Sequence, residues 1–366
     1  MMRTIRFGVI GLGRGQSFVD MCNVVGGASV TALYDVDLPR AQQVAAQLGI
    51  RAFGNYDDFL NGDIDAVVVA SPVAYHAQQA VAALQAGKHV LSEVTACLTL
   101  DDARALVKAA RAGSAVYMLS ENYRYMDEVE LLKRMHVDGR FGELYYGEGE
   151  YIHDCRGLWH NADGTLTWRG RGQLGVYGTH SLGPLLYILD DRVTSVSALA
   201  VPGGKFEPEV DFPTMHLLQM VTEHGATLRV RVDHVSPRPH AATYYALQGT
   251  HGCFEAQRGF GDHSKVWLDD EHGPSLFHVP AQWHALADQA PRYIPERLAA
   301  PREAGKGGHG TSEYWLLQDF LRAARGEGSA PIDVYRALDY TLPCICAVQS
   351  AVQGGAPVQV PDPRGW

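Results

Sequence analysis

Near its start the chain carries a short apolar run that ends in a cluster of glycines, Ile5-Arg6-Phe7-Gly8-Val9-Ile10-Gly11-Leu12-Gly13-Arg14-Gly15-Gln16. Residues 5–10 predict a buried strand, and the residues that follow the glycines are compatible with a helix. Such a turn is typical of dinucleotide-binding folds, because Gly11 permits the tight turn and Gly13 leaves room for a pyrophosphate. Arg14, Gly15 and Gln16 join them as candidate cofactor-binding residues near the start of the helix. Gln16 stands where the third glycine of GxGxxG belongs, so the match is partial.

Strand-like and helical segments alternate through the first third of the chain, which predicts βαβ units and a parallel sheet. The expected strands are 5–10, 29–34, 66–69, 89–92 and 116–119, and helices are expected at 39–48, 74–86 and 101–113. Thr99, three residues before Asp102, is expected to cap the last of these helices. We therefore expect a Rossmann domain over residues 1–122.

Asp35 ends the second expected strand, about twenty residues past the glycine turn. An acid at this place hydrogen-bonds the ribose hydroxyls and repels a 2′-phosphate, which favours NAD over NADP. The alternative is a glycine turn that holds no nucleotide, with Asp35 as a solvated surface acid.

The pattern changes after Asn122, and residues 123–366 predict an α+β domain for substrate binding and oligomerisation. Successive extended runs joined by short turns indicate a largely antiparallel open sheet. The expected strands are 144–151, 193–200, 215–223, 227–234, 243–249 and 252–256, with helices at 128–137 and 180–189. Two closing helices, 312–325 and 334–352, are expected to pack back on the Rossmann domain. Residues 270–310 are rich in Gly, Pro and His and read as a long surface arm.

The bulk composition narrows the class of protein. The formal charge of −10 argues against a nucleic-acid surface. No stretch is long and apolar enough to span a bilayer. Six scattered cysteines without a CxxC, and no signal-peptide pattern, indicate the cytoplasm. The sixteen histidines show none of the spacings of a metal site, so no metal is expected.

Several motifs resemble the Gfo/Idh/MocA superfamily, named for glucose–fructose oxidoreductase, inositol dehydrogenase and a rhizopine-catabolism protein. They are the glycine turn, Ser71-Pro72 with His76, the run from Gly87 to Glu93, and Gly178-Thr179-His180. The resemblance spans nearly the whole chain. It implies an NAD(P)-dependent, sugar-active enzyme that forms dimers or tetramers through the open sheet.

Two positions depart from the usual dehydrogenase pattern of that superfamily. Glu93-Val94-Thr95 stands where most members carry Glu-Lys-Pro, whose lysine is their usual acid/base, and Val176 replaces their usual aspartate. The NAD-dependent α-N-acetylgalactosaminidases of the superfamily also read Glu-Val there. The chain is also similar to them at Glu148 through Asp154, Tyr177 through Pro184, Ser236 through Pro239 and Gly307 through Gly310. The loop between His153 and Trp168 departs from those enzymes.

This narrower resemblance implies a redox-neutral glycosidase cycle. Hydride leaves C3 of the sugar for NAD⁺, the acidified C2 proton is lost, and the aglycone leaves C1. Water then adds and the hydride returns. Such a cycle needs bases for the C3 hydroxyl and for C2–H.

Candidate residues for these steps follow from spacing and from the resemblance. His180 is the expected acid/base with Tyr177 beside it, because residues three apart at a helix start face one side. Arg169 is a candidate for a sugar contact since guanidinium offers a rigid fork of donors. The alternative for His180 is a buried, hydrogen-bonded histidine of the core, and the alternative for Arg169 is a surface arginine without a functional role. The remaining candidates are Tyr125 and Tyr151 for the sugar, and Glu93, Val94, Asn122, Ser71, Pro72 and His76 for the cofactor.

Three hypotheses stay open at this point: a glycosidase that recycles NAD, a net sugar or inositol dehydrogenase in which His180 replaces the lysine, and a noncatalytic NAD-binding protein.

Overall fold

The computed structural model describes residues 3–173, 175–239, 241–269 and 282–366. The chain divides into two compact units, each described by itself below. Unit 1 comprises Met1–Tyr125, Pro301–Thr341 and Asp362–Trp366. Unit 2 comprises Met126–Ala300 and Leu342–Pro361. The described part of the chain has no helix that is both long and apolar enough to cross a membrane.

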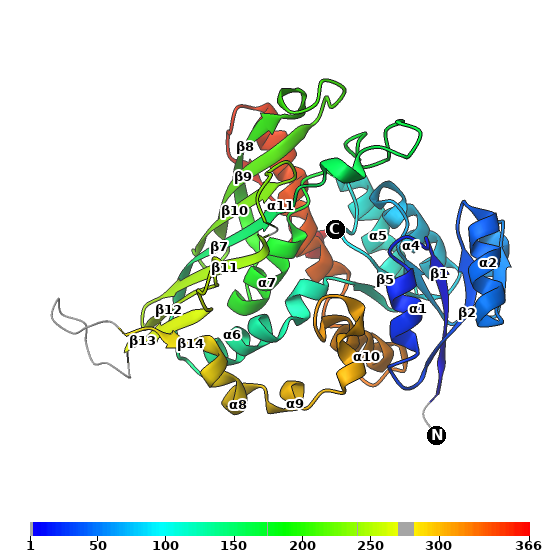
Figure 1. Cartoon of the computed structure of the whole chain (residues 1–366), viewed down its shortest axis with the longest axis horizontal. Coiled ribbons are helices and arrows are strands. Elements are labelled where there is room, and N and C mark those ends of the chain that lie inside the picture. Colours follow the sequence, from blue (N-terminus) through cyan, green and yellow to red (C-terminus); the bar gives the residue numbers. More distant parts are fainter. Residues whose placement is uncertain (1–2, 174, 240, 270–281) are drawn as a thin grey trace. The chain divides into compact units, whose positions relative to one another are not determined.

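Unit 1 is built on a six-stranded parallel sheet in the order β3-β2-β1-β4-β5-β6, the strand order of a dinucleotide-binding fold (Figure 1). Its strands are β1 (Ile5–Ile10), β2 (Ala28–Tyr34), β3 (Arg51–Phe53), β4 (Ala66–Val69), β5 (His89–Ser92) and β6 (Tyr117–Leu119). The connecting helices are α1 (Gln16–Cys22), α2 (Leu38–Leu48), α3 (Tyr56–Leu60), α4 (His76–Gln85) and α5 (Leu100–Ala112). β4 is buried along its whole length, as expected for a strand covered on both faces. The predicted fold class, a Rossmann fold with a parallel sheet, is confirmed.

Local capping explains where several of these helices begin. The Thr99 hydroxyl accepts a hydrogen bond from the Asp102 N–H at 3.1 Å at the start of α5, as predicted. Asp37 and Asn55 cap α2 and α3 in the same way. β3 and α3 were not predicted, because elements of three and five residues are too short to show a period.

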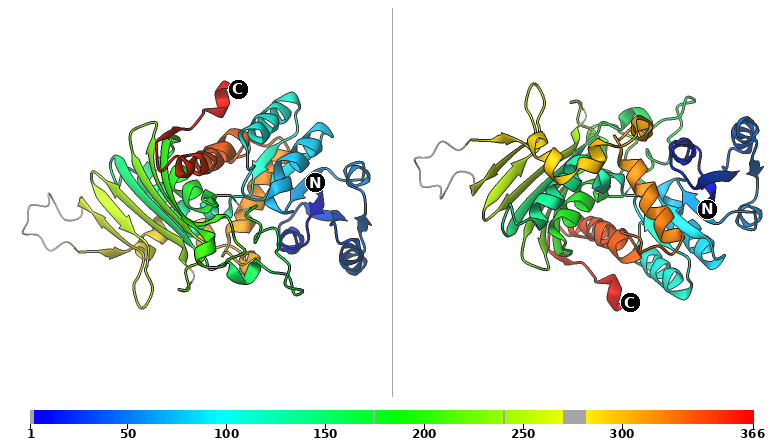
Figure 2. Two further views of the ribbon diagram at one scale, coloured as in Figure 1. Left: turned by 90° about the horizontal axis from the view of Figure 1, so that it is seen from above. Right: turned by 90° about the horizontal axis from the view of Figure 1, so that it is seen from below.

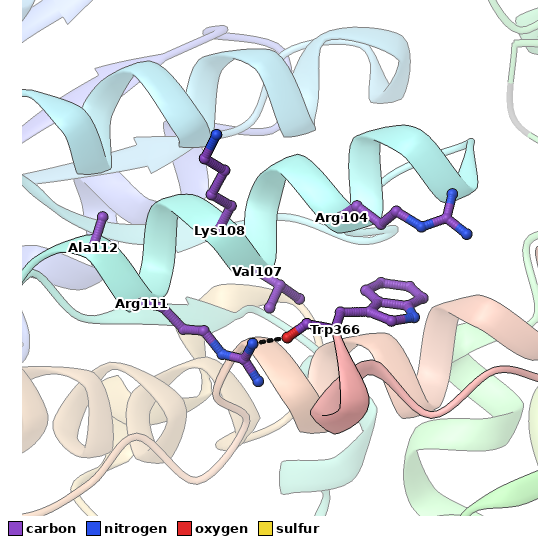
Figure 3. Close-up of a pocket in the computed structure, with 6 residues that line it drawn as sticks. All are labelled: Arg104, Val107, Lys108, Arg111, Ala112 and Trp366. Carbon is purple, nitrogen blue, oxygen red and sulfur yellow. Dashed lines mark hydrogen bonds between the residues drawn. The ribbon is translucent and has the colours of Figure 1, made fainter.

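Later segments of the chain complete unit 1. Helix α10 (Ser312–Ala324) packs Phe320 against Phe7 of β1, with ring centroids 5.7 Å apart. At the end of the chain, Trp366 borders a groove of about 530 Å³ along α5 (Figure 3). Arg111 donates a hydrogen bond to the Trp366 carbonyl, and Arg104 lies 5.3 Å from the centre of its ring. These contacts anchor the last residues to α5.

Unit 2 is built on a nine-stranded sheet in the order β14-β13-β12-β11-β7-β10-β9-β8-β15. The strands are β7 (Leu144–Ile152), β8 (Val193–Pro202), β9 (Pro213–Thr222), β10 (Thr227–Asp233), β11 (Ala241–Gly249), β12 (Gly252–Glu255), β13 (Lys265–Leu268), β14 (His284–Ala285) and β15 (Val358–Gln359). All neighbouring strands are antiparallel except β7 and β10, which run parallel. The prediction of a second, largely antiparallel sheet is therefore confirmed.

Helices α6 (Asp127–Val137) and α7 (Thr179–Leu189) lie on one face of this sheet, with α7 over β7 and β11 (Figure 2). Helix α11 (Val334–Val352) begins in unit 1 and ends in unit 2. A buried hydrogen bond joins α11 to β8 near the edge of the sheet: Ser350 Oγ accepts from the Ala198 N–H at 2.9 Å.

The predicted surface arm at 270–310 differs from the structure. Residues 270–281 lie outside the described residues. The described remainder contains β14, α8 (Ala290–Tyr293) and α9 (Pro295–Leu298). Leu286, Ala290 and Ile294 are buried, and Arg297 forms an ion pair with Asp127 at 3.1 Å. The apolar residues at 286, 290 and 294 are spaced by four and form a buried row, which the Gly and Pro content of the segment did not indicate.

Candidate active site

The glycine turn of unit 1 lies between β1 and α1 and is shaped by two close approaches. Gly11 has a φ of 81°, and a Cβ added there would lie 2.5 Å from the Ala70 carbonyl oxygen. A Cβ added at Gly15 would lie 2.4 Å from the Gly11 carbonyl oxygen. Gly13 has no such neighbour, because a Cβ there meets nothing within 4 Å among the described residues. The turn thus needs glycine at Gly11 and Gly15 for its own packing and leaves the backbone at Gly13 open, as a bound pyrophosphate requires.

Asp35 lies beside this turn at the end of β2. Its carboxylate accepts hydrogen bonds from the Leu12 N–H at 2.7 Å and from the Asp37 N–H at 2.9 Å. These two bonds hold the carboxylate against the glycine turn, the place where an acid accepts bonds from a ribose. The residues present therefore fit a dinucleotide.

Arg14 and Glu93 are engaged with each other and with a buried carboxylate that sequence reasoning missed. The Arg14 guanidinium donates to Glu93 at 2.7 Å and to Glu313 of α10 at 3.1 Å. Glu313 is 1% exposed and also accepts a hydrogen bond from Asn122 Nδ2 at 3.1 Å. Arg14 and Asn122, both predicted to bind the cofactor, thus both donate hydrogen bonds to Glu313.

His309 completes the environment of Glu313. Its Nδ1 lies 2.7 Å from Glu313 Oε1, and its side chain is 35% exposed. Burial acts to raise the pKa of Glu313, but the hydrogen bonds and charges of His309 and Arg14 outweigh it and lower the pKa to about 2. A carboxylate that accepts from one imidazole nitrogen orients the ring and fixes its tautomer. The Gly-rich motif around His309 was the only sequence signal for this pair.

Ser71, Pro72 and His76 shape the loops that follow β4 and β5. The His76 ring is 2% exposed, and its two nitrogens lie 2.9 Å from the carbonyl oxygens of Thr95 and Ser71. Ser71 Oγ donates to Gln79 at 2.6 Å, and Pro72 starts the short helix at Val73–Tyr75. Burial lowers the pKa of His76. His76 therefore holds the two loops together, and Val94, 4% exposed, lies within one of them.

In unit 2, two predicted residues come together around a third, His180. The ring centroids of Tyr177 and His180 are 5.1 Å apart, and those of Tyr151 and His180 are 5.4 Å apart. Tyr151 and Tyr177 are themselves 5.5 Å apart. His180 is in the first turn of α7, and its carbonyl accepts a hydrogen bond from the Tyr245 hydroxyl at 2.6 Å. We call Tyr151, Tyr177 and His180 the ring cluster.

Two glycines of β7 explain why α7 comes so close to the sheet. A Cβ added at Gly149 would lie 2.8 Å from Ser181 Cβ, and one at Gly147 would lie 3.2 Å from Leu185 Cδ2. Side chains at alternate positions of a strand share a face, so both glycines open the same face to the helix. The Gly147-x-Gly149 spacing therefore determines the depth at which His180 is held.

Further polar side chains border the ring cluster and were not predicted. His153 Nδ1 lies 3.2 Å from the Tyr151 hydroxyl. His234 follows β10, with its ring centroid 6.0 Å from that of Tyr151. Its Nδ1 is 3.6 Å from Cys155 Sγ. These residues meet because β7 and β10 pair side by side, which their separate sequence motifs do not reveal.

Tyr125 and Arg169 were also predicted to contact the sugar. The Tyr125 hydroxyl, in unit 1, donates to Asp319 of α10 at 3.0 Å, and the residue is 2% exposed. The Arg169 guanidinium lies 4.1 Å from the ring centre of Trp168. Among the described residues no group of three or more His, Cys, Asp or Glu side chains is arranged to hold a metal.

Comparison with known proteins identifies both parts of the chain. Residues 5–121 match the Gfo/Idh/MocA oxidoreductase family with an NAD-binding Rossmann fold, and residues 210–365 match the C-terminal domain of glycosyl hydrolase 109. NAD is accordingly the cofactor of the Rossmann fold.

Whole-chain relatives agree with these matches. A glycosyl hydrolase family 109 protein of Shewanella amazonensis is 30% identical over 375 residues, covering 91% of this chain and 80% of the relative. Another, of Streptomyces coelicolor, is 28% identical over 398 residues, covering 98% and 83%. A levoglucosan dehydrogenase in complex with NADH and levoglucosan shares the fold, with a TM-score of 0.80 and 20% identity over 98% of this chain and 100% of its own. The chain belongs to glycosyl hydrolase family 109, and its first part has the NAD-binding fold of the Gfo/Idh/MocA oxidoreductases.

Proposed function

We propose that this enzyme hydrolyses glycosides by transient oxidation of the sugar at C3, with the ring cluster of unit 2 holding the sugar and moving its protons. The observation that carries the proposal is the packing of Tyr151 and Tyr177 around His180. The family name of its relatives supports hydrolysis, and the redox-neutral cycle joins hydrolysis to an NAD-binding fold. We further propose that residues 1–122 bind the cofactor and that residues 123–366 supply the substrate and subunit contacts.

When bound, NAD supplies the hydride acceptor and donor for one carbon of the sugar. Gly11, Gly13 and Asp35 would hold it, because the turn leaves the backbone open at Gly13 and places the Asp35 carboxylate beside it. Glu93 and Val94 follow β5 at the carboxyl edge of the parallel sheet, where such folds bind ligands. We assign them to the nicotinamide end.

His180 takes the proton of the C3 hydroxyl in this mechanism and returns it when C3 is reduced again. The imidazole is 7% exposed, so it exchanges protons with a bound sugar rather than with bulk water. Tyr177 and Tyr151 lie against the ring and orient it, and their hydroxyl groups are suited to hold the sugar.

His309 is the second acid/base candidate, in unit 1. Glu313 accepts from its Nδ1, which directs Nε2 to proton transfer. The cycle needs a base for C2–H and aid to the departing aglycone, and Val94 supplies neither. We propose His309 for the C2 proton.

The test is a panel of p-nitrophenyl α- and β-glycosides, with nitrophenol release and NADH absorbance followed together. Repeated release that NAD⁺ stimulates, without accumulating NADH, is expected of the wild type and is lost in His180→Ala. His263→Ala, a change at an exposed histidine of the same unit, is the matched control and keeps wild-type rates. NADH that accumulates without aglycone release would establish a net dehydrogenase instead. No signal in either channel with any member of the panel, despite bound NAD, would favour a noncatalytic NAD-binding protein.

We also propose that the enzyme is a cytoplasmic homodimer or homotetramer joined through the sheet face opposite α7. Leu199 and Val221 lie on that face and are 60% and 48% exposed. All six cysteines are free thiols, which supports a reducing compartment. Light scattering after size exclusion is expected to give at least two chains, and fewer in Leu199→Asp. A monomeric wild type would contradict this proposal.

A further inference from the structure

A group of buried polar atoms without partners lies at the ends of β9 and β10. Thr214 Oγ1, His216 Nδ1 and His234 Nε2 have no hydrogen-bond partner within the described residues. The three residues are 0%, 5% and 5% exposed. Buried polar groups are almost always hydrogen-bonded, so three unpaired atoms in one place indicate a missing partner.

These residues belong to one local arrangement. Thr214 and His216 stand at alternate positions of β9 and therefore share a face of the sheet. The His234 N–H donates to the Thr214 carbonyl at 3.0 Å, which brings the residue after β10 alongside them. The unpaired atoms thus come from two neighbouring strand ends.

The arrangement borders the ring cluster. The His234 ring centroid is 6.0 Å from that of Tyr151 and 6.4 Å from that of Tyr177. Its Nδ1 faces Cys155 Sγ at 3.6 Å, which leaves Nε2 as the ring atom for another partner. The unpaired atoms therefore lie beside the two tyrosines that we propose to hold the sugar.

The two imidazoles of this arrangement, His216 and His234, are uncharged at physiological pH. Burial lowers the pKa of His216 to about 4. Burial, followed by the charges of His216 and His153, lowers the pKa of His234 to about 4 against the opposing effect of Asp233. Neutral imidazoles and a hydroxyl both donate and accept hydrogen bonds, and they offer no counter-charge to an ion.

We infer that Thr214, His216 and His234 form a subsite that binds an uncharged hydroxyl or amide group of the sugar and discriminates against charged substituents. This inference rests on the proposed function, since it places the sugar at the ring cluster. It makes His234 a specificity residue for a neutral glycoside.

The test is calorimetric binding to the NAD-loaded full-length enzyme. The probes are methyl N-acetyl-α-galactosaminide, its cationic 2-amino counterpart and the anionic methyl α-galacturonide. The neutral sugar is expected to bind most tightly. His234→Leu is expected to weaken its binding roughly fivefold to tenfold, the loss of about one hydrogen bond. His234→Gln restores a neutral donor and acceptor and recovers most of the affinity, and His263→Leu is the matched control with wild-type affinity.

Thr214→Val keeps the shape of the side chain and removes only its hydroxyl, so it tests the site even if His234→Leu folds poorly. Unchanged affinity in both variants, or charged sugars that bind as tightly as the neutral one, would overturn the inference and leave ordered water as the partner. Sugar binding that depends on His234 without any aglycone release would support the subsite and reject the glycosidase proposal. Failure of the two proposals is therefore distinguishable.

Discussion

The most demanding test of how the fold positions His180 is Gly149→Ala in β7. The added Cβ would lie 2.8 Å from Ser181 Cβ and 3.3 Å from Leu185 Cδ1. Because carbon atoms pack at about 3.5–4.0 Å, α7 must move away from β7 by roughly an ångström or the clash must be absorbed as strain. Overpacking of this kind costs about 1–3 kcal/mol. A displacement of about 1 Å in a catalytic group lowers activity by up to about a hundredfold.

The assays separate these two consequences. Urea unfolding measures the loss of stability, and nitrophenol release at saturating sugar measures the effect on kcat. Gly157→Ala is the matched control, because a Cβ there meets nothing within 4 Å among the described residues, and its change should stay within about 0.5 kcal/mol. Ser181→Gly in the Gly149→Ala background removes the nearest carbon and is expected to restore part of kcat. A Gly149→Ala enzyme with wild-type stability and wild-type kcat would show that the close contact between β7 and α7 does not position His180.

Three further changes test the cofactor unit. Glu313→Gln removes a carboxylate whose pKa is lowered from 4.5 to about 2, so this carboxylate stabilises the wild type above pH 4.5 and ceases to do so as the pH falls towards 2. The free energies of unfolding of the two proteins should therefore converge between pH 4.5 and pH 2. A difference that stays constant over this range would contradict the lowered pKa of Glu313. Asp35→Ala is expected to weaken NAD binding about tenfold and to raise the ratio of NADP to NAD affinity in fluorescence titrations, whereas an unchanged ratio would remove Asp35 from the ribose site. Thr99→Ala removes the α5 cap and should lower the free energy of unfolding by about 1 kcal/mol, measured by thermal unfolding, without changing kcat. A change near zero would show that the cap does not contribute to stability.

The Rossmann unit was predictable because its signals are local. β4 is buried on both faces and therefore reads as a continuous apolar run, and the turn at Gly11 and Gly13 follows the first such run directly. The place of Asp35 beside the turn was predictable for the same reason, because this residue directly follows the next strand. Short elements such as β3 escaped, since three residues show no period.

The ion pairs around Arg14 and the unpaired atoms around His234 could not be predicted from local sequence signals. Arg14 meets Glu313 across 299 residues of sequence, and nothing near either residue indicates the other. His234 comes to Tyr151 only through the parallel pairing of β7 with β10, an exception in an antiparallel sheet. Such contacts depend on topology, which hydrophobic periodicity does not encode.

In the proposed cycle the sugar is oxidised at C3 and loses its C2 proton before the aglycone leaves. Hydrolysis in D₂O by the NAD-loaded enzyme tests it most directly, with mass spectrometry and NMR of the released sugar. We predict one deuterium at C2 of each product molecule, with no net NADH, and loss of both product and label in His180→Ala. Aglycone release that leaves the C2 hydrogen unexchanged would contradict it, because direct displacement at C1 never breaks that bond.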